Sequence, residues 1–327
     1  MTTEAQLTRA FDAFARLEKA LAEVIVGQES VSRQTLIALL SRGNVLLEGV
    51  PGLGKTLLVR TLSHALGLPF SRIQFTPDLM PTDIIGTNII REVGGDRRFE
   101  FSRGPLFANI VLADEVNRAT PKTQSALLEA MEERTVTVAG TTYRLDEPFI
   151  VLATQNPIEM EGTYPLPEAQ LDRFMLKIRV EYPSLEDLVR ITTINTEAAE
   201  IAFPEPAASA EDILIARSVV RDLPIAEGLR EYVARLVLAT HPESEFAPAM
   251  VRDFVQYGAS PRAAIAVIRA AKAHAFLSGE VHVRPSDIEA VFLPALNHRI
   301  ILNFKGEAEG ASPTTILREV WQKVAVL

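Results

Sequence analysis

The sequence has no cysteine, which excludes disulfides, thiolate nucleophiles and thiolate metal sites and is compatible with a reducing compartment. Histidine is scarce as well: the five histidines include no pair at the spacing of two ligands on one helix, which argues against a histidine-built metal site. No apolar run approaches the roughly 18 residues that a membrane helix needs. Basic residues are fewer than acidic ones, 33 against 42, so the formal net charge is −9, which disfavours nucleic acid as a partner.

The remaining composition is that of a globular chain long enough for two domains. At 327 residues, 47% of them hydrophobic, the chain exceeds the usual size of one domain. The first 25 residues combine scattered acids with a 3.6-residue apolar period, which predicts a helix rather than a secretory signal, and we expect a cytoplasmic protein. We place the two domains at residues 1–182 and 183–327.

The first domain has the pattern of an α/β fold. Between residues 44 and 180, short and nearly continuous apolar runs alternate with helical patterns; the runs are NVLLE, FSRIQF, NIVLAD, FIVLAT and MLKIRV. Strands buried on both faces have this composition, so we predict a parallel sheet flanked by helices. Two insertions resemble hairpins, with TNII and RFEF around GGD and with TVTV and TYRL around AGT. Beyond residue 182 the patterns are helical, which predicts a second, helical domain.

A glycine-rich octet follows the first predicted strand. The letters GVPGLGKT, residues 49–56, fit the phosphate-binding pattern G-x-x-x-x-G-K-[ST] and directly precede a predicted helix. Its backbone amides and the helix N-terminus would hold phosphate, and the lysine would reach the β- and γ-phosphates of ATP. A plain strand-to-helix turn is the alternative, but it gives no reason for the lysine and the hydroxyl. The predicted nucleotide contacts are Gly49, Pro51, Gly52, Leu53, Gly54, Lys55, Thr56 and Leu57.

An acidic pair ends the third apolar run of the predicted sheet. Asp114 and Glu115 would lie at its carboxyl edge, beside the phosphates. We assign Asp114 and Thr56 to Mg²⁺, and Glu115 to the water that attacks the γ-phosphate, with Lys55 as a catalytic cation. An acidic N-cap pair for the next helix is the alternative.

With these motifs placed, the chain resembles the MoxR family of AAA+ ATPases from VIVGQE to RPSDI. The specific stretches are GVPGLGKT, QFTPDLMPTDIIG, GPLFANIVLADEVNRA, LLEAMEERTVTV, LATQNPIEMEGTYPLPEAQLDRF and SPRA. The resemblance implies a P-loop AAA+ sheet with a C-terminal all-helical lid, and Mg²⁺-dependent ATP hydrolysis. It also implies that the hairpins are the helix 2 insert and the pre-sensor 1 insert, which face a pore or a partner.

The resemblance further implies roles for three polar residues. Asn156 would be the sensor 1 amide, although an asparagine after a strand is commonly a turn residue. Arg173 would be an arginine finger for a neighbouring subunit, with a local ion pair to Asp172 or Glu168 as the alternative. Arg262 follows a serine and a proline that open a lid helix, and it would be the sensor 2 arginine on its own subunit's γ-phosphate rather than a solvent-facing side chain.

The same resemblance assigns Ile25, Val26 and Gly27 to the adenine ring, where ordinary core packing is the alternative. It implies a ring, expected to be a hexamer, that remodels or matures client proteins together with a protein bearing a von Willebrand factor type A domain. A magnesium chelatase motor subunit, a DNA helicase or loader, and a nucleotide-binding scaffold are the alternatives. The client, the nature of the output and the contacts of the two hairpins do not follow from the sequence.

Overall fold

A five-stranded parallel sheet forms the centre of the computed structural model, which describes residues 4–93, 96–156, 163–197 and 202–324. The strand order is β2-β5-β8-β1-β9, and the bounds are β1 (Val45–Glu48), β2 (Phe70–Gln74), β5 (Ile110–Asp114), β8 (Ile150–Gln155) and β9 (Leu176–Arg179). The inner strands are almost fully buried because helices cover both faces, which explains why their sequences do not alternate. The predicted α/β fold is confirmed.

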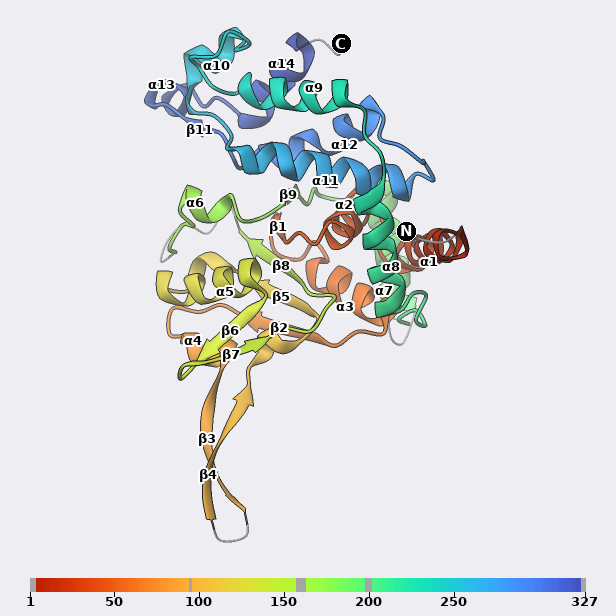
Figure 1. Ribbon diagram of the computed structural model, residues 1–327, viewed down its shortest axis with the longest axis vertical. Helices are drawn as coiled ribbons and strands as arrows, with labels where there is room; N and C mark the ends of the chain where they lie inside the picture. The colour runs from red at the N-terminus through yellow and green to blue at the C-terminus, as the bar shows by residue number, and fades with distance from the viewer. Residues whose placement is uncertain (1–3, 94–95, 157–162, 198–201, 325–327) are drawn as a thin grey trace.

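Four helices from the first half of the chain flank this sheet (Figure 1). They are α1 (Glu4–Val24), α2 (Glu29–Leu40), α3 (Lys55–Leu66) and α5 (Pro121–Glu133). The predicted stripe of α1 buries Phe14, Leu17 and Leu21, while Phe11 stacks on Phe276 of the lid with ring centroids 4.6 Å apart. The first helix therefore joins the α/β part of the chain to the lid.

Both predicted hairpins are present, each formed by two antiparallel strands. The longer hairpin follows α4 (Pro81–Ile85), consists of β3 (Gly86–Val93) and β4 (Asp96–Arg103), and projects far from the body (Figure 1). The predicted GGD turn falls on Gly94 and Gly95, which lie outside the described residues. The shorter hairpin, β6 (Thr135–Val138) and β7 (Thr141–Arg144), turns at a glycine with φ of 82°. The two hairpins meet at their bases, where Phe101 stacks on Tyr143 at 4.2 Å.

Two 3-10 turns and one short helix complete the α/β part: η1 (Pro105–Phe107), η2 (Val116–Arg118) and α6 (Glu168–Leu171). The rest of the chain is mainly helical: α7 (Leu185–Glu197), α8 (Ala210–Asp222), α9 (Glu227–Leu238), α10 (Ala249–Phe254), α11 (Pro261–Leu277), α12 (Pro285–Leu296), α13 (Phe304–Ala308) and α14 (Pro313–Lys323). It also contains a short antiparallel ladder of β10 (Val255–Tyr257) and β11 (Ile301–Leu302). The lid is thus helical apart from this ladder.

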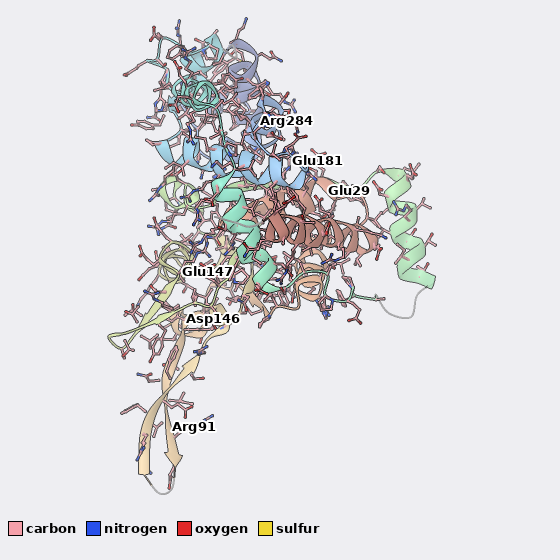
Figure 2. The ribbon with its side chains drawn as sticks, turned by 45° about the vertical axis from the view of Figure 1, so that its right-hand side comes forward. Glu29, Arg91, Asp146, Glu147, Glu181 and Arg284 are labelled. Atoms are coloured by element: carbon pink, nitrogen blue, oxygen red, sulfur yellow. The ribbon has the colours of Figure 1, made fainter. Side chains whose placement is uncertain are left out.

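The two parts of the chain share one hydrophobic core. The cluster runs from Leu47 in the sheet, through Leu17 and Ile213, to Phe276 and Val291 in the lid. Helix α8 packs against α1, so residues after 182 also cover the flank of the α/β part. Helix α7, in contrast, stands away from the body (Figure 2). In the described part of the chain, the structure contains no helix with the length and apolarity that a membrane crossing requires.

Candidate functional site

The glycine-rich loop turns back between β1 and α3. Gly52 and Gly54 have φ of 84° and 76°, values that side-chain-bearing residues rarely adopt, and a Cβ on either would meet no atom within 4 Å. Lys55 begins α3, and its Nζ donates to the carbonyl oxygen of Gly49 at 2.6 Å. The loop thus leaves open space beside its backbone at a helix N-terminus, as a phosphate site requires.

A cavity of about 350 Å³ opens beside this loop. Its lining brings together most of the predicted catalytic and phosphate-binding residues: Pro51, Gly52, Gly54, Lys55, Thr56, Asp114, Glu115 and Asn156. Three other predicted contacts do not line it: Gly49 binds the lysine, Leu53 is buried, and Leu57 packs against the core. The structure therefore assembles residues from three separate motifs around one space.

The acidic pair is held by a threonine that sequence reasoning missed. Thr154 Oγ1 donates to Asp114 Oδ1 at 2.6 Å and accepts from the backbone N–H of Glu115 at 2.8 Å. Glu115 has a left-handed φ of 55°, which turns its side chain away from the path of the strand. One hydroxyl on β8 thus holds both acidic residues in place. If the two residues served only as an N-cap for the next helix, this contact would not be needed.

Two further polar residues reach the acidic pair from β2. Arg72 pairs with Asp114 Oδ2 at 2.6 Å, and Gln74 donates to Glu115 Oε2 at 2.9 Å. Both also line the cavity. The signal for Gln74 was present, because parallel strands place their carboxyl ends at one edge and Gln74 is the last residue of β2.

Electrostatics in the cavity centre on the lysine. Burial lowers the pKa of Lys55, while the negative charges of Asp114 and Glu115 oppose that shift. A triphosphate would add negative charge beside the ammonium group and favour its charged form.

The donor set fits a nucleotide-borne Mg²⁺. Among the described residues, the structure contains no group of three or more histidine, cysteine or acidic side chains that could hold a metal by itself. Mg²⁺ in nucleotide sites takes one or two protein oxygens, and phosphates and water supply the rest. Asp114 and Thr56, which line one cavity beside the loop, offer such a partial set.

The predicted adenine contacts do not line this cavity. Ile25 and Val26 are buried, and Gly27 lies against the side chain of Asp187. The adjacent Gln28 nevertheless donates to the carbonyl oxygen of Leu53 at 2.6 Å, so this segment touches the glycine-rich loop. The adenine assignment stays a prediction.

The predicted arginine finger and the predicted sensor 2 arginine lie at the other edge of the sheet. Strand β9 runs parallel to β1, with Leu176 beside Val45, so Arg173 precedes β9 at the amino edge. The glycine-rich loop follows Glu48, the last residue of β1 at the carboxyl edge. A strand of this length separates the two edges by roughly 13 Å, since each residue adds about 3.3 Å. Arg173 thus lies at the end of the sheet opposite to its own loop.

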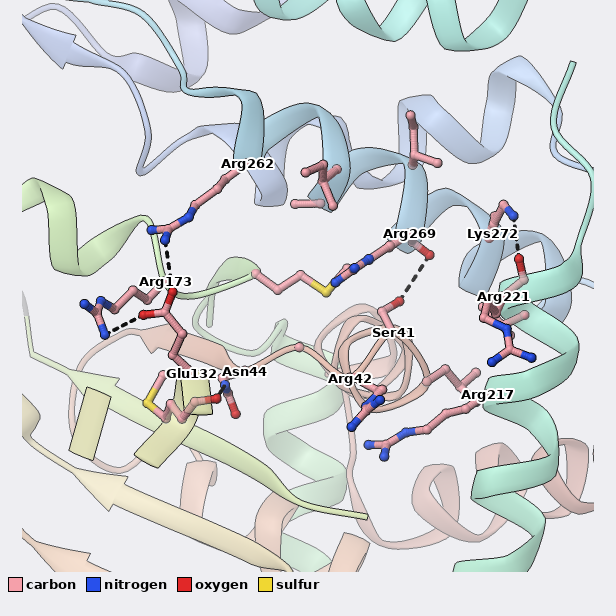
Figure 3. A pocket seen from close by; sticks show the side chains of 18 of the residues that line it. Ser41, Arg42, Asn44, Glu132, Arg173, Arg217, Arg221, Arg262, Arg269 and Lys272 are labelled. Atoms are coloured by element: carbon pink, nitrogen blue, oxygen red, sulfur yellow. Dashed lines mark hydrogen bonds and ion pairs between the residues drawn. The ribbon is translucent and has the colours of Figure 1, made fainter. Parts of the chain in front are cut away.

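Arg262 shares a carboxylate with Arg173 (Figure 3). Glu132 Oε2 is 2.6 Å from Arg173, and its Oε1 is 3.0 Å from Arg262. Asp172 is a weaker partner of Arg262, at 3.7 Å. The local partner of Arg173 is thus Glu132 rather than Asp172 or Glu168. We expect Arg262 from the sequence at the phosphates of its own chain, but it does not line the cavity beside that chain's glycine-rich loop.

A buried arginine ties the segment that contains Arg173 to the lid. Arg299 follows α12, is 3% exposed at its side chain, and pairs with Asp172 Oδ1 at 2.8 Å. It also donates to the carbonyl oxygens of Phe174 and Met175 at 2.7 and 3.1 Å. Neither Arg299 nor Glu132 was identified from the sequence, because both act through partners far away in the chain.

Known proteins share this architecture along nearly the whole chain. Residues 44–176 match the model of the ATPase family associated with various cellular activities (AAA), and residues 248–320 match the AAA lid domain. Chaperone MoxR1 of Mycobacterium tuberculosis is 45% identical, over 95% of this chain and 82% of its own. Protein MoxR of Methylorubrum extorquens is 34% identical, over 91% and 90%. The chain belongs to the MoxR family. This MoxR-family protein is therefore an AAA+ ATPase, an enzyme that hydrolyses ATP.

A crystal structure supports the same placement of this MoxR-family chain. A Cytophaga hutchinsonii protein described as a candidate ATPase superposes with a TM-score of 0.92 at 44% identity, covering 99% of this chain and 98% of the other. The lid is therefore present in both chains as part of one conserved overall shape.

Proposed function

We propose that this MoxR-family ATPase hydrolyses Mg²⁺-bound ATP at sites that two neighbouring chains share. The observation that supports this is the separation of the glycine-rich loop from Arg173 and Arg262 by the length of the sheet. A chain cannot bring both ends of its sheet to one phosphate. A neighbour that presents its amino edge would supply the missing cations, and repetition of that contact closes a ring. A hexamer is the ring we expect.

Within one chain, the residues around the loop would divide the work. Lys55, released from the carbonyl of Gly49, would bind the β- and γ-phosphates, while Thr56 and Asp114 hold Mg²⁺. The metal, when bound, would neutralise charge on the phosphates. Glu115 would orient and deprotonate the attacking water, and Asn156 would hold that water or a γ-phosphate oxygen.

Across the contact, Arg173 would stabilise the charge that develops on the neighbour's γ-phosphate. Arg262 shares Glu132 with it, so we assign Arg262 to the same neighbouring site instead of its own chain's site. Glu132 would hold both guanidinium groups ready before the neighbour arrives.

Mixing two inactive variants tests the shared site. Lys55→Ala removes the phosphate cation of a site and Arg173→Ala removes the neighbour's contribution, so each variant alone should lose activity. Random mixing in a ring leaves about one site in four with both residues, so the mixture should recover roughly a quarter of the parental rate. A mixture that stays as inactive as its components would contradict the neighbour's role. A mixture of Lys55→Ala with Glu115→Ala is the control. Because both residues line the same cavity of one chain, no site in a mixed ring has both of them, and this mixture should stay inactive.

We further propose a chaperone-like output in the cytoplasm, with client proteins and a type A domain protein as partners. The printed name of the relative Chaperone MoxR1 supports this direction. The similarity to MoxR proteins does not favour the chelatase motor or the DNA helicase alternative. Affinity capture with Glu115→Gln in ATP, which should hold the ATP state, tests the proposal by identifying the retained proteins. A Glu115→Gln variant that hydrolyses ATP at the parental rate would remove our catalytic assignment and leave the scaffold alternative.

A further inference from the structure

A second cavity lies at the amino edge of the sheet, beneath helix α11. Its volume is about 910 Å³, and ten arginine or lysine residues line it against three carboxylates. Two of the carboxylates, Glu132 and Asp172, serve Arg173, Arg262 and Arg299. The remaining lining is strongly positive, although the whole chain has a net charge of −9. This charge is therefore a local feature of the cavity.

We name the positive side of this cavity the basic recess and define it by Arg42, Arg217, Arg221, Arg269 and Lys272. Figure 3 shows Arg42, Arg217, Arg221 and Lys272 on one side, with Arg269 between them and Arg262. These side chains come from three separate segments: the turn after α2, helix α8 and helix α11. The fold thus brings cations together from residues that are more than 200 positions apart.

The two cations from α11 lack carboxylate partners. Arg269 and Lys272 are three residues apart on one face of the helix. Within the part of the chain that the structure describes, neither forms an ion pair, and Lys272 Nζ donates only to the backbone carbonyl of Arg221 at 2.7 Å. Burial and the nearby charge of Arg230 lower the pKa of Lys272, while the charge of Asp222 opposes that shift. An anion at this position would add to the opposing effect and favour the charged ammonium group.

The deeper part of the basic recess has too few acceptors for its donors. Glu147 is the one carboxylate lining it, and it is shared by Arg42, at 2.6 Å, and Arg217. Arg217 is only 8% exposed, and its Nη2 is buried without a hydrogen-bond partner. A buried guanidinium nitrogen without an acceptor costs free energy, so a bound group that supplies an acceptor there, whether water or an anion, would be stabilising.

We propose that the basic recess binds a small polyphosphate-bearing anion at a second site, separate from the glycine-rich loop. Converging guanidinium groups suit phosphate because their fork of donors matches two phosphate oxygens at once. The whole cavity, of which the basic recess is one side, has a volume within the range of small-molecule sites, about 300–1,000 Å³. The five positive charges face Glu147 in the cavity and Asp222, which pairs with Arg221 at 3.1 Å, and the remaining excess of positive charge calls for a ligand with several negative charges rather than one. The proposal does not depend on ring formation, since one chain supplies every residue of the basic recess.

Calorimetric titration with sodium tripolyphosphate tests the proposal. The full chain carrying Lys55→Ala is the background, because this change weakens phosphate binding at the glycine-rich loop. This protein should bind one tripolyphosphate per chain. Adding Arg269→Gln and Lys272→Gln should weaken binding about tenfold or more, since each removes a charge-assisted hydrogen bond. Adding Arg252→Gln and Arg318→Gln instead is the matched control: both residues are exposed on the lid, outside the cavity, and the net charge changes equally.

Three results would overturn the proposal. The first is that the Lys55→Ala protein binds no tripolyphosphate. The second is that the Arg269→Gln, Lys272→Gln pair and the control pair weaken tripolyphosphate binding equally, which indicates a general electrostatic attraction rather than a site. The third is that the Arg269→Gln, Lys272→Gln pair changes the sedimentation coefficient but leaves tripolyphosphate binding unchanged, which indicates that a second copy of the chain occupies the basic recess. Thermal melting of each variant checks that it is folded, and Arg269→Lys with Lys272→Arg, which conserves charge, should retain binding.

Discussion

Arg299 offers the sharpest test of how the lid is attached to the rest of the chain. Replacing it with methionine removes an ion pair of 2.8 Å to Asp172 and the hydrogen bonds to the carbonyl oxygens of Phe174 and Met175. Breaking a buried ion pair from one side costs about 3–5 kcal/mol. Asp172 is 18% exposed and keeps contacts with Ser260 and Arg262, so its charge is partly compensated after the change. We therefore expect the lower end, a loss of about 3 kcal/mol in the free energy of unfolding.

Urea unfolding followed by circular dichroism measures this loss. Arg235→Met is the control, because Arg235 also forms an ion pair, with Glu231 at 2.6 Å, but at a more exposed place where 28% and 55% of the side chains are accessible. An exposed pair contributes less than about 1 kcal/mol. If Arg299→Met lowers the free energy of unfolding no more than Arg235→Met does, the buried ion pair does not stabilise the attachment of the lid, and our reasoning is refuted.

The remaining predictions concern the acidic pair and pH. Thr154→Val removes the hydroxyl that binds Asp114 and the Glu115 backbone, so kcat should fall about 10–100-fold, as for other residues that orient metal ligands; Thr137→Val, in the exposed hairpin, should keep the parental kcat. Burial lowers the pKa of His298 well below its usual 6.5, so below that pH the unfolded chain binds a proton that the folded chain does not. Stability should therefore decrease as pH falls from 7 to 5, with a slope of at most about 1.4 kcal/mol per pH unit from this group. His298→Gln should reduce that slope in urea unfolding series, and an unchanged slope would contradict the assignment.

The elements of the α/β part could be predicted because their signals are local. A run such as NIVLAD is buried on both faces whichever strands lie beside it, so its composition identifies it before its neighbours are known. The glycine-rich loop could be recognised for the same reason, since the φ near 80° at Gly52 and Gly54 requires glycine at those two positions whatever the rest of the fold is. Thr154 and Gln74 lie at the carboxyl edge, where the predicted sheet would have allowed them to be found.

The position of the lid could not be predicted in this way. Glu132 contacts Arg262, 130 residues later, and Asp172 contacts Arg299, 127 residues later, so each pair depends on how two separately recognisable parts pack together. The period of α11 predicts a helix with one apolar face, but it does not specify which surface that face covers. The expectation that Arg262 would lie at its own chain's phosphates rested on resemblance, and the packing of this lid places it elsewhere.

This packing also has a consequence for how hydrolysis could be coupled to movement. Asp172 receives Arg299 and Ser260 from the lid, and it directly precedes Arg173 in the chain. A rotation of the lid would therefore pull on the segment that contains Arg173, whereas a lid attached elsewhere would leave this segment in place. Because Arg173 lies at the end of the sheet opposite to its own glycine-rich loop, the shared site that we propose implies that such a movement would change the neighbour's site rather than the chain's own site. Communication along a ring would then pass from one chain's lid to the next chain's nucleotide, with Asp172 as the mechanical link.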